Sequence, residues 1–281
     1  MATHIVDGAI LKRWVRAPGP TDHKYSRGVL GLLTGSKEYP GAALLGVSAA
    51  LRTGIGMVRY LGPPEVGSLV VVAHPEVVLT SGNIDACVVG SGMAHPHPPN
   101  DTLAIDAVAA LGIPAVLDAG ALGAAASFGP LTVLTPHSGE LRVLGETLGL
   151  SGGGDDLEKA RIIAAHLGQC VVVKGSITTI VERSSDMWQL PEATGWLATA
   201  GTGDALAGIM GAVFAAHAHT LLEQPHLLCE ATQASALIHQ RAAARAVRFA
   251  AQEIRGGPGG PITVSDLIEQ IPAVIAEVLA S

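Results

Sequence analysis

Aromatic and charged residues are scarce in this chain. Of its 281 residues, Phe, Trp and Tyr make up 3%, and Asp, Glu, Lys and Arg make up 15%. Apolar residues reach 48%, which excludes disorder over most of the chain, because a disordered segment combines low hydrophobicity with high charge. The net charge of −7 argues against nonspecific nucleic-acid binding, which requires a basic surface. The composition therefore predicts a globular protein without a nucleic-acid partner.

Long apolar runs and closely spaced cysteines are also absent from the sequence. Because no run of roughly 18–20 uninterrupted apolar residues is present, we expect no membrane span. The N-terminus lacks a basic start followed by an apolar stretch, so we expect no signal peptide. Cys87, Cys170 and Cys229 are far apart and form no CxxC motif. We interpret them as buried thiols of a cytoplasmic protein, with a catalytic thiol as the alternative.

Short β-branched or apolar runs alternate with Ala/Leu-rich stretches of helical period. This alternation predicts βαβ units and a largely parallel sheet with helices on both faces. The expected strands are 28–34, 57–61, 69–72, 86–90, 114–117, 131–134, 170–174, 178–182 and 187–190. The expected helices are 41–54, 101–111, 140–148, 157–167, 203–216, 227–250 and 264–279.

Two features refine this organisation. The connection between 170–174 and 178–182 is too short for a crossover helix, so this pair is expected to form an antiparallel hairpin at one end of a mixed sheet. The Pro/Gly clusters are short and lie between predicted elements, so we expect residues 1–281 to form a single domain.

The segment TAGTGDALAG at 199–208 carries the strongest chemical signal. A loop of small residues runs into a long apolar helix, whose first N–H groups are free to bind an anion such as phosphate. Asp204 stands at this helix start, where the helix dipole is expected to lower its pKa. The alternative is that Asp204 only caps the helix and the glycines only form a turn. The GxxxxGK[ST] phosphate loop is absent from the chain.

Other polar residues follow predicted strands. His137 and Glu140 lie in TPHSGE, Lys174 ends the run VVVK, and Asp118 follows the residues AVL at 115–117. Each has a simple structural interpretation, such as a locally bonded loop histidine, a first-turn carboxylate or a solvated strand-end lysine. Glycine turns at 90–93 and 31–41 also follow predicted strands. Because open α/β sheets bind ligands at the carboxyl ends of their strands, the set predicts a ligand cleft at one sheet edge.

Metal ligands are poorly represented. His95 and His97 lie in a proline-rich loop without cysteine or acidic partners nearby, so we expect no structural metal site. A Mg²⁺ ion that enters with a nucleotide is a better expectation, because it requires few protein ligands.

Taken together, the motifs resemble the ADP/ATP-dependent NAD(P)H-hydrate dehydratase family of the ribokinase-like superfamily. Seven segments match in order and spacing: HKYSRG at 23–28, LLTGSKEYPGAALLGVSAALRTGIGMV at 32–58, VVGSGM at 88–93, VLDAGAL at 116–122, LTPHSGEL at 134–141, VVVKGSITTIV at 171–181 and ATAGTGDALAGI at 198–209. The resemblance implies a ribokinase-like three-layer αβα sandwich with a mostly parallel central sheet. It also implies a homotetramer, and the chain has only about 20 residues before the match, so no N-terminal epimerase domain is expected.

The resemblance implies ADP-dependent dehydration of (6S)-NAD(P)H hydrate, which restores NADH or NADPH, with Mg²⁺ and with ATP as the alternative donor. Asp204 matches the catalytic residue of the family. The matching substrate-binding positions are Ala42, Gly92, His137 and Asp204. The matching nucleotide-binding positions are Lys174, Gly175, Ser176, Ile177, Thr178 and Gly203.

Three positions depart from the family pattern. The usual GPGLG is GSGMA at 90–94, the usual DADAL is DAGAL at 118–122, and Ser138 replaces the proline of TPHPGE. Two alternatives are therefore kept. The first is a ribokinase-like small-molecule kinase that would use the same aspartate, and the second is a noncatalytic nucleotide-binding relative.

Overall fold

One mixed sheet forms the centre of the molecule in the computed structural model, which describes residues 3–94, 97–150, 154–250 and 259–281. Within these residues the strand order is β1-β9-β8-β7-β6-β5-β4-β2-β3. The strands are β1 (Thr3–Ile5), β2 (Val29–Leu33), β3 (Met57–Tyr60), β4 (Ala86–Val89), β5 (Ala115–Leu117), β6 (Thr132–Leu134), β7 (Cys170–Val173), β8 (Thr179–Val181) and β9 (Met187–Gln189). Only β8 runs antiparallel to its neighbours, which confirms the hairpin expected after β7.

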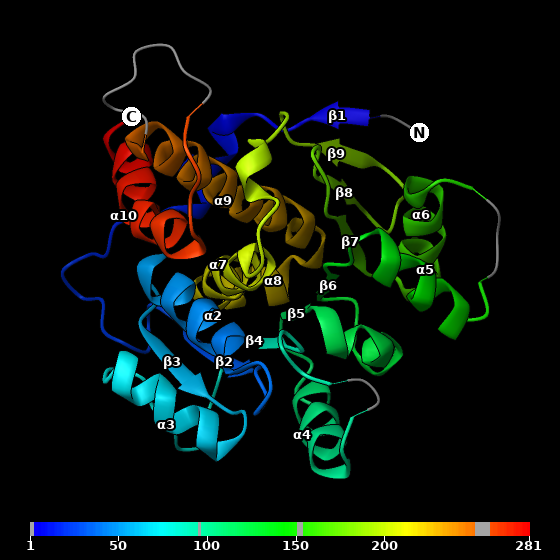
Figure 1. The fold of residues 1–281 in the computed structure, drawn as a ribbon, viewed down its shortest axis with the longest axis horizontal. Coiled ribbons are helices and arrows are strands. Elements are labelled where there is room, and N and C mark those ends of the chain that lie inside the picture. Colours follow the sequence, from blue (N-terminus) through cyan, green and yellow to red (C-terminus); the bar gives the residue numbers. More distant parts are fainter. Residues whose placement is uncertain (1–2, 95–96, 151–153, 251–258) are drawn as a thin grey trace.

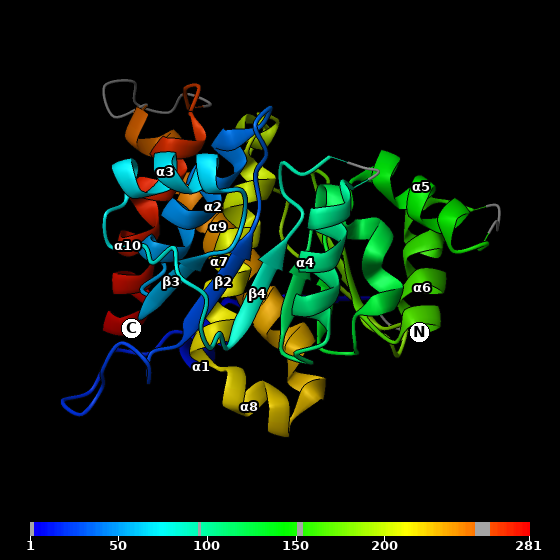
Figure 2. The same ribbon diagram turned by 90° about the horizontal axis from the view of Figure 1, so that it is seen from below.

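Helices cover both faces of this sheet, as Figures 1 and 2 show. On one face lie α2 (Pro40–Arg52), α7 (Thr202–Ala216), α9 (Leu228–Ala250) and α10 (Val264–Ala280). On the other lie α4 (Pro99–Ala109), the 3₁₀ helix η2 (Ala119–Ser127), α5 (Ser138–Thr147) and α6 (Asp156–Leu167). The smaller elements are α1 (Leu11–Trp14), α3 (Pro64–Ala73), α8 (Ala218–Glu223), η1 (Gly8–Ile10), η3 (Gly195–Leu197) and η4 (Pro225–Leu227). None of the helices in the described ranges is both long and apolar enough to cross a membrane.

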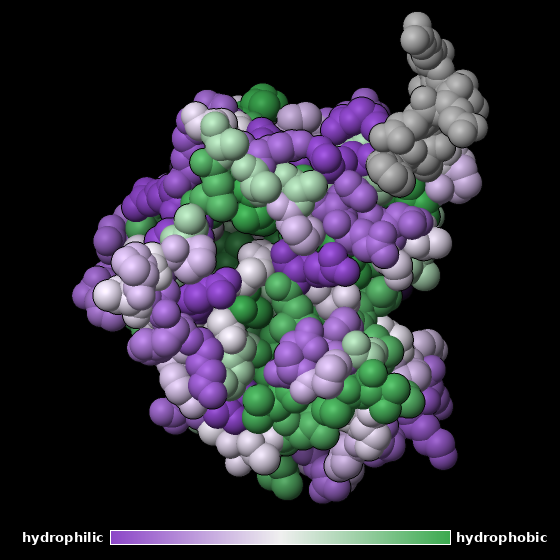
Figure 3. Space-filling view, turned by 90° about the vertical axis from the view of Figure 1, so that its left-hand side faces the viewer, coloured by the Kyte–Doolittle hydropathy of each residue, from purple (hydrophilic) through white to green (hydrophobic). Residues whose placement is uncertain are grey.

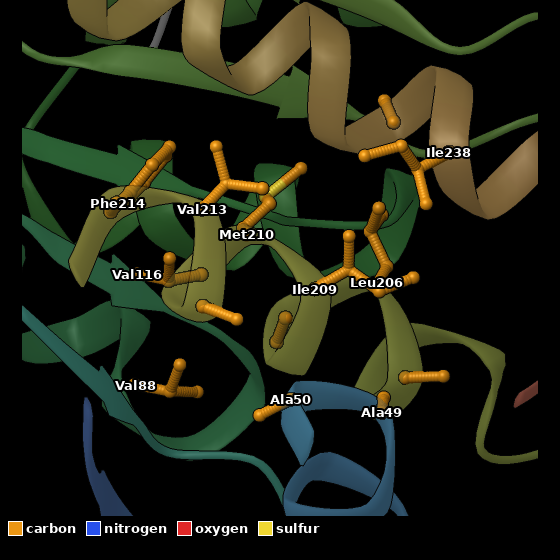
Figure 4. Close-up of a cluster of buried hydrophobic side chains, with 14 of the residues drawn as sticks. Ala49, Ala50, Val88, Val116, Leu206, Ile209, Met210, Val213, Phe214 and Ile238 are labelled. Carbon is orange, nitrogen blue, oxygen red and sulfur yellow. The ribbon is translucent and has the colours of Figure 1, made fainter. Parts of the chain in front are cut away.

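Alternating side chains of the strands supply two hydrophobic cores. In β4, for example, Val88 packs in the core beneath α7, whereas Cys87 and Val89 pack in the core beneath α4 and η2. This is the period of two that a strand buried on both faces imposes. Figure 4 shows how α7 fills the first core with Leu206, Ile209, Met210, Val213 and Phe214, against Val88 and Val116 of the sheet, Ala49 and Ala50 of α2 and Ile238 of α9.

The expected strand at 69–72 is wrong. Its residues, Leu69 to Val72, belong to α3, whose buried side is formed by Val66 and Val70. A short run of β-branched residues cannot by itself distinguish a strand from a helix. Leu69 is 48% exposed and Val72 is 85% exposed. In Figure 3, apolar residues gather in the lower part of the visible face, at the height of α3. The short elements β1, α1 and α8 were not predicted.

Because β2 to β7 are mutually parallel, their carboxyl ends lie along the same edge of the sheet. In Figure 2 the arrowheads of β2 and β4 point toward this edge. The segments that follow these strands include the loops singled out at 31–41, 90–93, 118–122, 134–140 and 174–176, and the loop at 199–208 follows β9, which runs parallel to β7. The predicted gathering of polar loops at one edge is therefore confirmed.

Close packing of α7 against α2 positions one part of this edge. A Cβ atom at Gly208 of α7 would lie 2.3 Å from the carbonyl oxygen of Gly46 in α2. That separation is shorter than any van der Waals contact, so only glycine permits the two helices to approach this closely.

We expect Gly208→Ala to lower the free energy of unfolding by about 1–3 kcal/mol, because the added methyl group forces the two backbones apart. Denaturant titration measures this change. Gly145→Ala in α5 is the matched control, because its Cβ would have no neighbour nearer than 3.7 Å. The control should be neutral or stabilising, since alanine favours a helix by about 0.5–1 kcal/mol over glycine. Equal losses in the two variants would contradict the packing argument.

Candidate functional site

The start of α7 presents free main-chain donors at the sheet edge. Gly201 caps the helix in the left-handed region, with φ of 93°. In the described chain, the N–H groups of Thr202, Gly203 and Asp204 donate to no protein acceptor, whereas Ala205 N–H bonds to the carbonyl of Gly201. The Thr202 hydroxyl bonds to the carbonyl of Thr199 at 3.1 Å instead of capping the helix. Such a helix start binds an anionic group through its N–H groups and its dipole.

Asp118 forms the buried centre of the site. Its carboxylate, which follows β5, accepts hydrogen bonds from the hydroxyl of Ser91 at 3.0 Å and from the hydroxyl of Thr135 at 2.7 Å. It also forms an ion pair with the ammonium group of Lys174, with 2.8 Å between Nζ and Oδ1. Asp118 is 3% exposed. These bonds join the ends of β4, β5, β6 and β7, and they explain how a charge is accommodated in the interior.

Asp204 lies beside this network. The pKa of Asp204 is raised from 3.8 to about 6. Burial is the largest cause and the neighbouring charge of Asp118 also raises the pKa, whereas Lys174 and a hydrogen bond with Ser91 lower it. The expectation that the helix dipole would lower this pKa is therefore wrong, because burial and the second carboxylate outweigh the dipole. A carboxylate with a pKa near neutrality can take up a proton during a reaction and release it again.

His137 caps the N-terminus of α5. Its Nδ1 accepts hydrogen bonds from the N–H groups of Gly139 at 3.0 Å and Glu140 at 3.3 Å. The carboxylate of Glu140 accepts the N–H of His137 at 2.9 Å, which completes a capping box. Glu140 also lies 3.8 Å from the Nζ atom of Lys174. The histidine side chain is 61% exposed, and its Nε2 atom lies 3.5 Å from Oε1 of Glu140.

Ala42 and Gly92 lie next to each other. Gly92 has φ of 69°, and a Cβ atom there would lie 2.6 Å from the Cβ of Ala42 in the first turn of α2. A side chain at position 92 would therefore both strain the backbone and collide with α2. Because Gly92 directly follows Ser91, this pair adjoins the network of Asp118 and Asp204.

A cavity of about 430 Å³, here called the larger cavity, opens at the start of α7. Five of the six predicted nucleotide-binding residues line it: Lys174, Gly175, Ser176, Thr178 and Gly203. Ile177 does not, and its side chain is 46% exposed. The remaining wall comes from Leu190, residues 192–195, Leu197 and Ala198, and from Thr202, Leu206, Ala236, His239 and Gln240. Its size is that of an ordinary small-molecule site.

A second cavity of about 380 Å³, here called the smaller cavity, lies on the α5 side of the sheet edge. His137 and Glu140 line it, together with Met93, Gly120 and apolar residues of α5 and η2. Gly92 immediately precedes Met93, so the predicted substrate-binding positions lead from Asp204 toward this cavity. The site thus has two cavities, one lined by Lys174 and Gly203 and the other by His137 and Glu140.

The sequence matches the family model of NAD(P)H-hydrate dehydratase over residues 30–255, which is well over half of the chain. The chain belongs to the NAD(P)H-hydrate dehydratase family. The bifunctional NAD(P)H-hydrate repair enzyme Nnr of Mycobacterium tuberculosis H37Rv is 38% identical over 221 residues, which are 73% of this chain and 44% of that protein. The chain spans about half the length of such bifunctional relatives.

Two further proteins extend the likeness to structure. The ADP-dependent (S)-NAD(P)H-hydrate dehydratase of Bacillus subtilis is 32% identical over 69% of this chain and 75% of that protein. A crystal structure of ADP/ATP-dependent NAD(P)H-hydrate dehydratase from Bacillus subtilis, co-crystallised with ATP/Mg²⁺, has a TM-score of 0.75 at 25% identity, and the match covers 95% of this chain and 96% of that chain. A ribokinase-like superfamily protein of Enterococcus faecalis has a TM-score of 0.79 at 18% identity, covering 98% and 96%. The predicted ribokinase-like fold is thereby confirmed.

The departures from the family motifs are coupled in space. A Cβ atom at Gly120, where the family has its second aspartate, would lie 2.6 Å from the carbonyl oxygen of Met93. Met93 itself stands in the altered glycine turn and is 8% exposed. The main chain of Met93 thus occupies the space that a side chain at position 120 would need. The two substitutions are compatible with each other, and they leave the bonds of Asp118 intact.

Several residues of the site were not among the predicted site residues. The sequence indicates Asp118 only as a strand-end carboxylate, and Ser91 and Thr135 only as parts of loops. Lys174 and Asp118 are 56 positions apart, so their pairing leaves no local pattern. His239 and Gln240 lie in α9, where the sequence shows only the amphipathic period of a long helix. His95, considered as a metal ligand, lies outside the described residues.

Proposed function

We propose that this chain catalyses ADP-dependent dehydration of (6S)-NAD(P)H hydrate, which restores NADH or NADPH and yields AMP and phosphate. The observation that carries this proposal is the position of Asp204. A carboxylate whose pKa is raised to about 6 stands in the first turn of a helix with free N–H groups, beside the larger cavity. Phosphoryl transfer uses both features, because a base takes the proton of the attacking hydroxyl group and the helix start stabilises the charge of the transferred group.

We assign the adenine nucleotide to the larger cavity and the hydrated coenzyme to the opposite side of Asp204. The larger cavity contains Lys174 and the start of α7, which suit the negative phosphates. Ala42, Gly92 and His137 form the path from Asp204 to the smaller cavity, which suits an extended dinucleotide. In this arrangement the terminal phosphate and the hydroxyl group of the hydrated ring meet at Asp204.

The proposed reaction begins with attack of the substrate hydroxyl on the terminal phosphorus of ADP. Asp204 accepts the hydroxyl proton, the new P–O bond forms, and AMP leaves. The ring nitrogen lone pair then expels phosphate, and loss of a proton from the neighbouring carbon restores the double bond. The N–H groups of Gly203 and Asp204 and the ammonium group of Lys174 stabilise the charge on the transferred phosphoryl group.

Magnesium enters this proposal as part of the nucleotide co-substrate. In the described residues, no group of three or more His, Cys, Asp or Glu side chains is arranged to hold a metal ion. Mg²⁺ commonly keeps several water ligands and binds mainly through substrate phosphates, so such a site requires few protein ligands. We therefore assign no resident metal to the chain.

Absorbance at 340 nm tests the function directly. Purified protein is mixed with NADH hydrate, Mg²⁺ and either ADP or ATP. Recovery of absorbance that depends on the nucleotide is the expected result, and the faster nucleotide identifies the donor. Consumption of nucleotide with accumulation of a stable phosphorylated product would instead support a small-molecule kinase. Binding of nucleotide without any turnover would support a noncatalytic relative.

The wider setting of the protein is also a proposal. We propose that residues 1–281 form one cytoplasmic domain, since β1 and α10 pack on the same sheet and helices as the rest. We further propose a homotetramer, in which the exposed apolar side chains of Leu69 and Val72 on α3 are available for a subunit contact. Light scattering of the purified protein measures its mass, and a monomer would contradict this assembly.

A further inference from the structure

His239 is a buried polar residue that the proposed mechanism does not use. It lies in α9, lines the larger cavity and is only 8% exposed. Its Nε2 atom lies 3.0 Å from the carbonyl oxygen of Thr202, in the first turn of α7. No other described group forms a hydrogen bond with its ring.

The bond to Thr202 determines the tautomer of the imidazole. A carbonyl oxygen can only accept a hydrogen bond, so Nε2 must carry the proton and donate it. Burial lowers the pKa of His239 to about 4, so the ring is neutral at physiological pH. Nδ1 is therefore an unprotonated acceptor, without a partner among the described residues, on a side chain that faces the larger cavity.

The surroundings of this acceptor suit a flat heterocycle. Leu190, Leu197, Leu206 and Ala236 provide apolar wall in the same cavity. Lys174 and Gly203 line the same cavity and supply its cationic, phosphate-binding part. A nucleotide whose phosphates contact Lys174 and the start of α7 can therefore place its base against the α9 wall.

We propose that Nδ1 of His239 selects the base of the phosphoryl donor by accepting a hydrogen bond from the exocyclic amino group of adenine. This inference rests on the proposed function, because it requires an adenine nucleotide in the larger cavity. Guanine and hypoxanthine carry a carbonyl oxygen at the corresponding ring position. Their oxygen would face the Nδ1 lone pair, and two acceptors cannot form a hydrogen bond. A buried polar group left unpaired by the wrong ligand is an effective source of selectivity.

Calorimetric binding of nucleotide analogues to the purified protein tests the assignment. We expect ADP to bind roughly 3- to 10-fold more tightly than the diphosphate of purine riboside, which lacks the amino group. Inosine diphosphate, with its carbonyl group, should bind more weakly than either. The ratio of dissociation constants is measured within each variant, so a general loss of stability or cavity shape does not by itself change it.

Two substitutions separate base selection from support of α7. In His239→Asn, the amide oxygen can replace Nδ1, because both atoms are bonded to Cγ, but the donor to Thr202 is lost. In His239→Gln, the amide nitrogen can replace Nε2, but the acceptor at Nδ1 is lost. We expect the Asn variant to keep the preference for ADP over the purine analogue, and the Gln variant to reduce it to about 1.

Gln240→Leu is the matched control, since Gln240 is the next residue of α9, lines the same cavity and donates to the carbonyl of Pro191. It should leave the preference unchanged. A full preference in His239→Gln, or its loss only in Gln240→Leu, would overturn the assignment of His239. If ADP binds and supports repair without any such preference, only this inference fails. If no adenine nucleotide binds, the proposed function fails with it.

Discussion

Asp204→Asn is expected to lower turnover by about 10²–10⁴-fold while it raises the stability of the protein at neutral pH. The loss of turnover follows from the role of Asp204 as the base that accepts the substrate proton. Nucleotide affinity should change little, because the N–H groups of α7 and the ammonium group of Lys174 remain. Single-turnover rates and calorimetric binding of ADP measure the two effects separately. Near-normal turnover in this variant would exclude Asp204 as the base.

The gain in stability follows from the direction of the pKa shift. The pKa of Asp204 is about 6 in the folded protein, above its ordinary value of 3.8. Folding therefore favours the protonated form, and this contribution is fully present below pH 3.8 and is lost as the pH rises through about 6. At pH 7.5 the ionised carboxylate destabilises the fold. Asparagine stays neutral and removes that cost, which we place at about 1–2 kcal/mol after allowing for partial exposure.

Denaturant titration at pH 7.5 and pH 4 checks this linkage. The variant should exceed the wild type at pH 7.5, and the difference should shrink toward zero at pH 4. Asp106→Asn, at an exposed position of α4, is the control and should change stability little at either pH. A difference that is the same at both pH values would show that ionisation of Asp204 is not its cause. In the wild type, turnover should fall as the pH decreases below about 6.

The sequence predicted the placement of the site better than its electrostatics. A parallel sheet brings all strand ends to one edge, so strand predictions alone were enough to gather His137, Lys174 and Asp118. The pKa of Asp204 depends on Asp118 and Ser91, which precede it by 86 and 113 positions and approach it only in the folded chain. The sequence around Asp204 indicates a helix start, and therefore a helix dipole, but it does not show that the carboxylate is buried. The predicted direction of the pKa shift was therefore wrong.

The same limit applies to α3 and to the walls of the larger cavity. In α3, the β-branched run at 69–72 predicts a strand, because the sequence alone does not show that Val66 and Val70 pack on one side of a helix. His239 looks like one more polar residue of an amphipathic helix until α7 places the carbonyl of Thr202 against it. Residues that act through long-range contacts thus require the structure, whereas residues in glycine-rich or strand-end motifs can be recognised in advance.

Lys174→Met is expected to lower the free energy of unfolding by about 3 kcal/mol, because it leaves the buried carboxylate of Asp118 without its cation. Denaturant titration measures the loss. Lys159→Met is the control, since Lys159 pairs with Asp156 at the surface, 3.6 Å away, and should cost less than about 1 kcal/mol. Lys174 also lowers the pKa of Asp204, so its removal should move the acidic limb of the pH–rate profile above pH 6.

A double variant distinguishes the structural role of Lys174 from its role in nucleotide binding. In Asp118→Asn/Lys174→Met the buried carboxylate is gone, so stability should return to within about 1 kcal/mol of the wild type. Affinity for ADP should be lower than in the wild type, as in Lys174→Met alone, because the ammonium group that pairs with phosphate is missing from the larger cavity. If the double variant recovered both stability and ADP affinity, Lys174 would serve only to neutralise Asp118. If it recovered neither, the fold would depend on the hydrogen bonds of Ser91 and Thr135 to an ionised Asp118 and not on the ion pair.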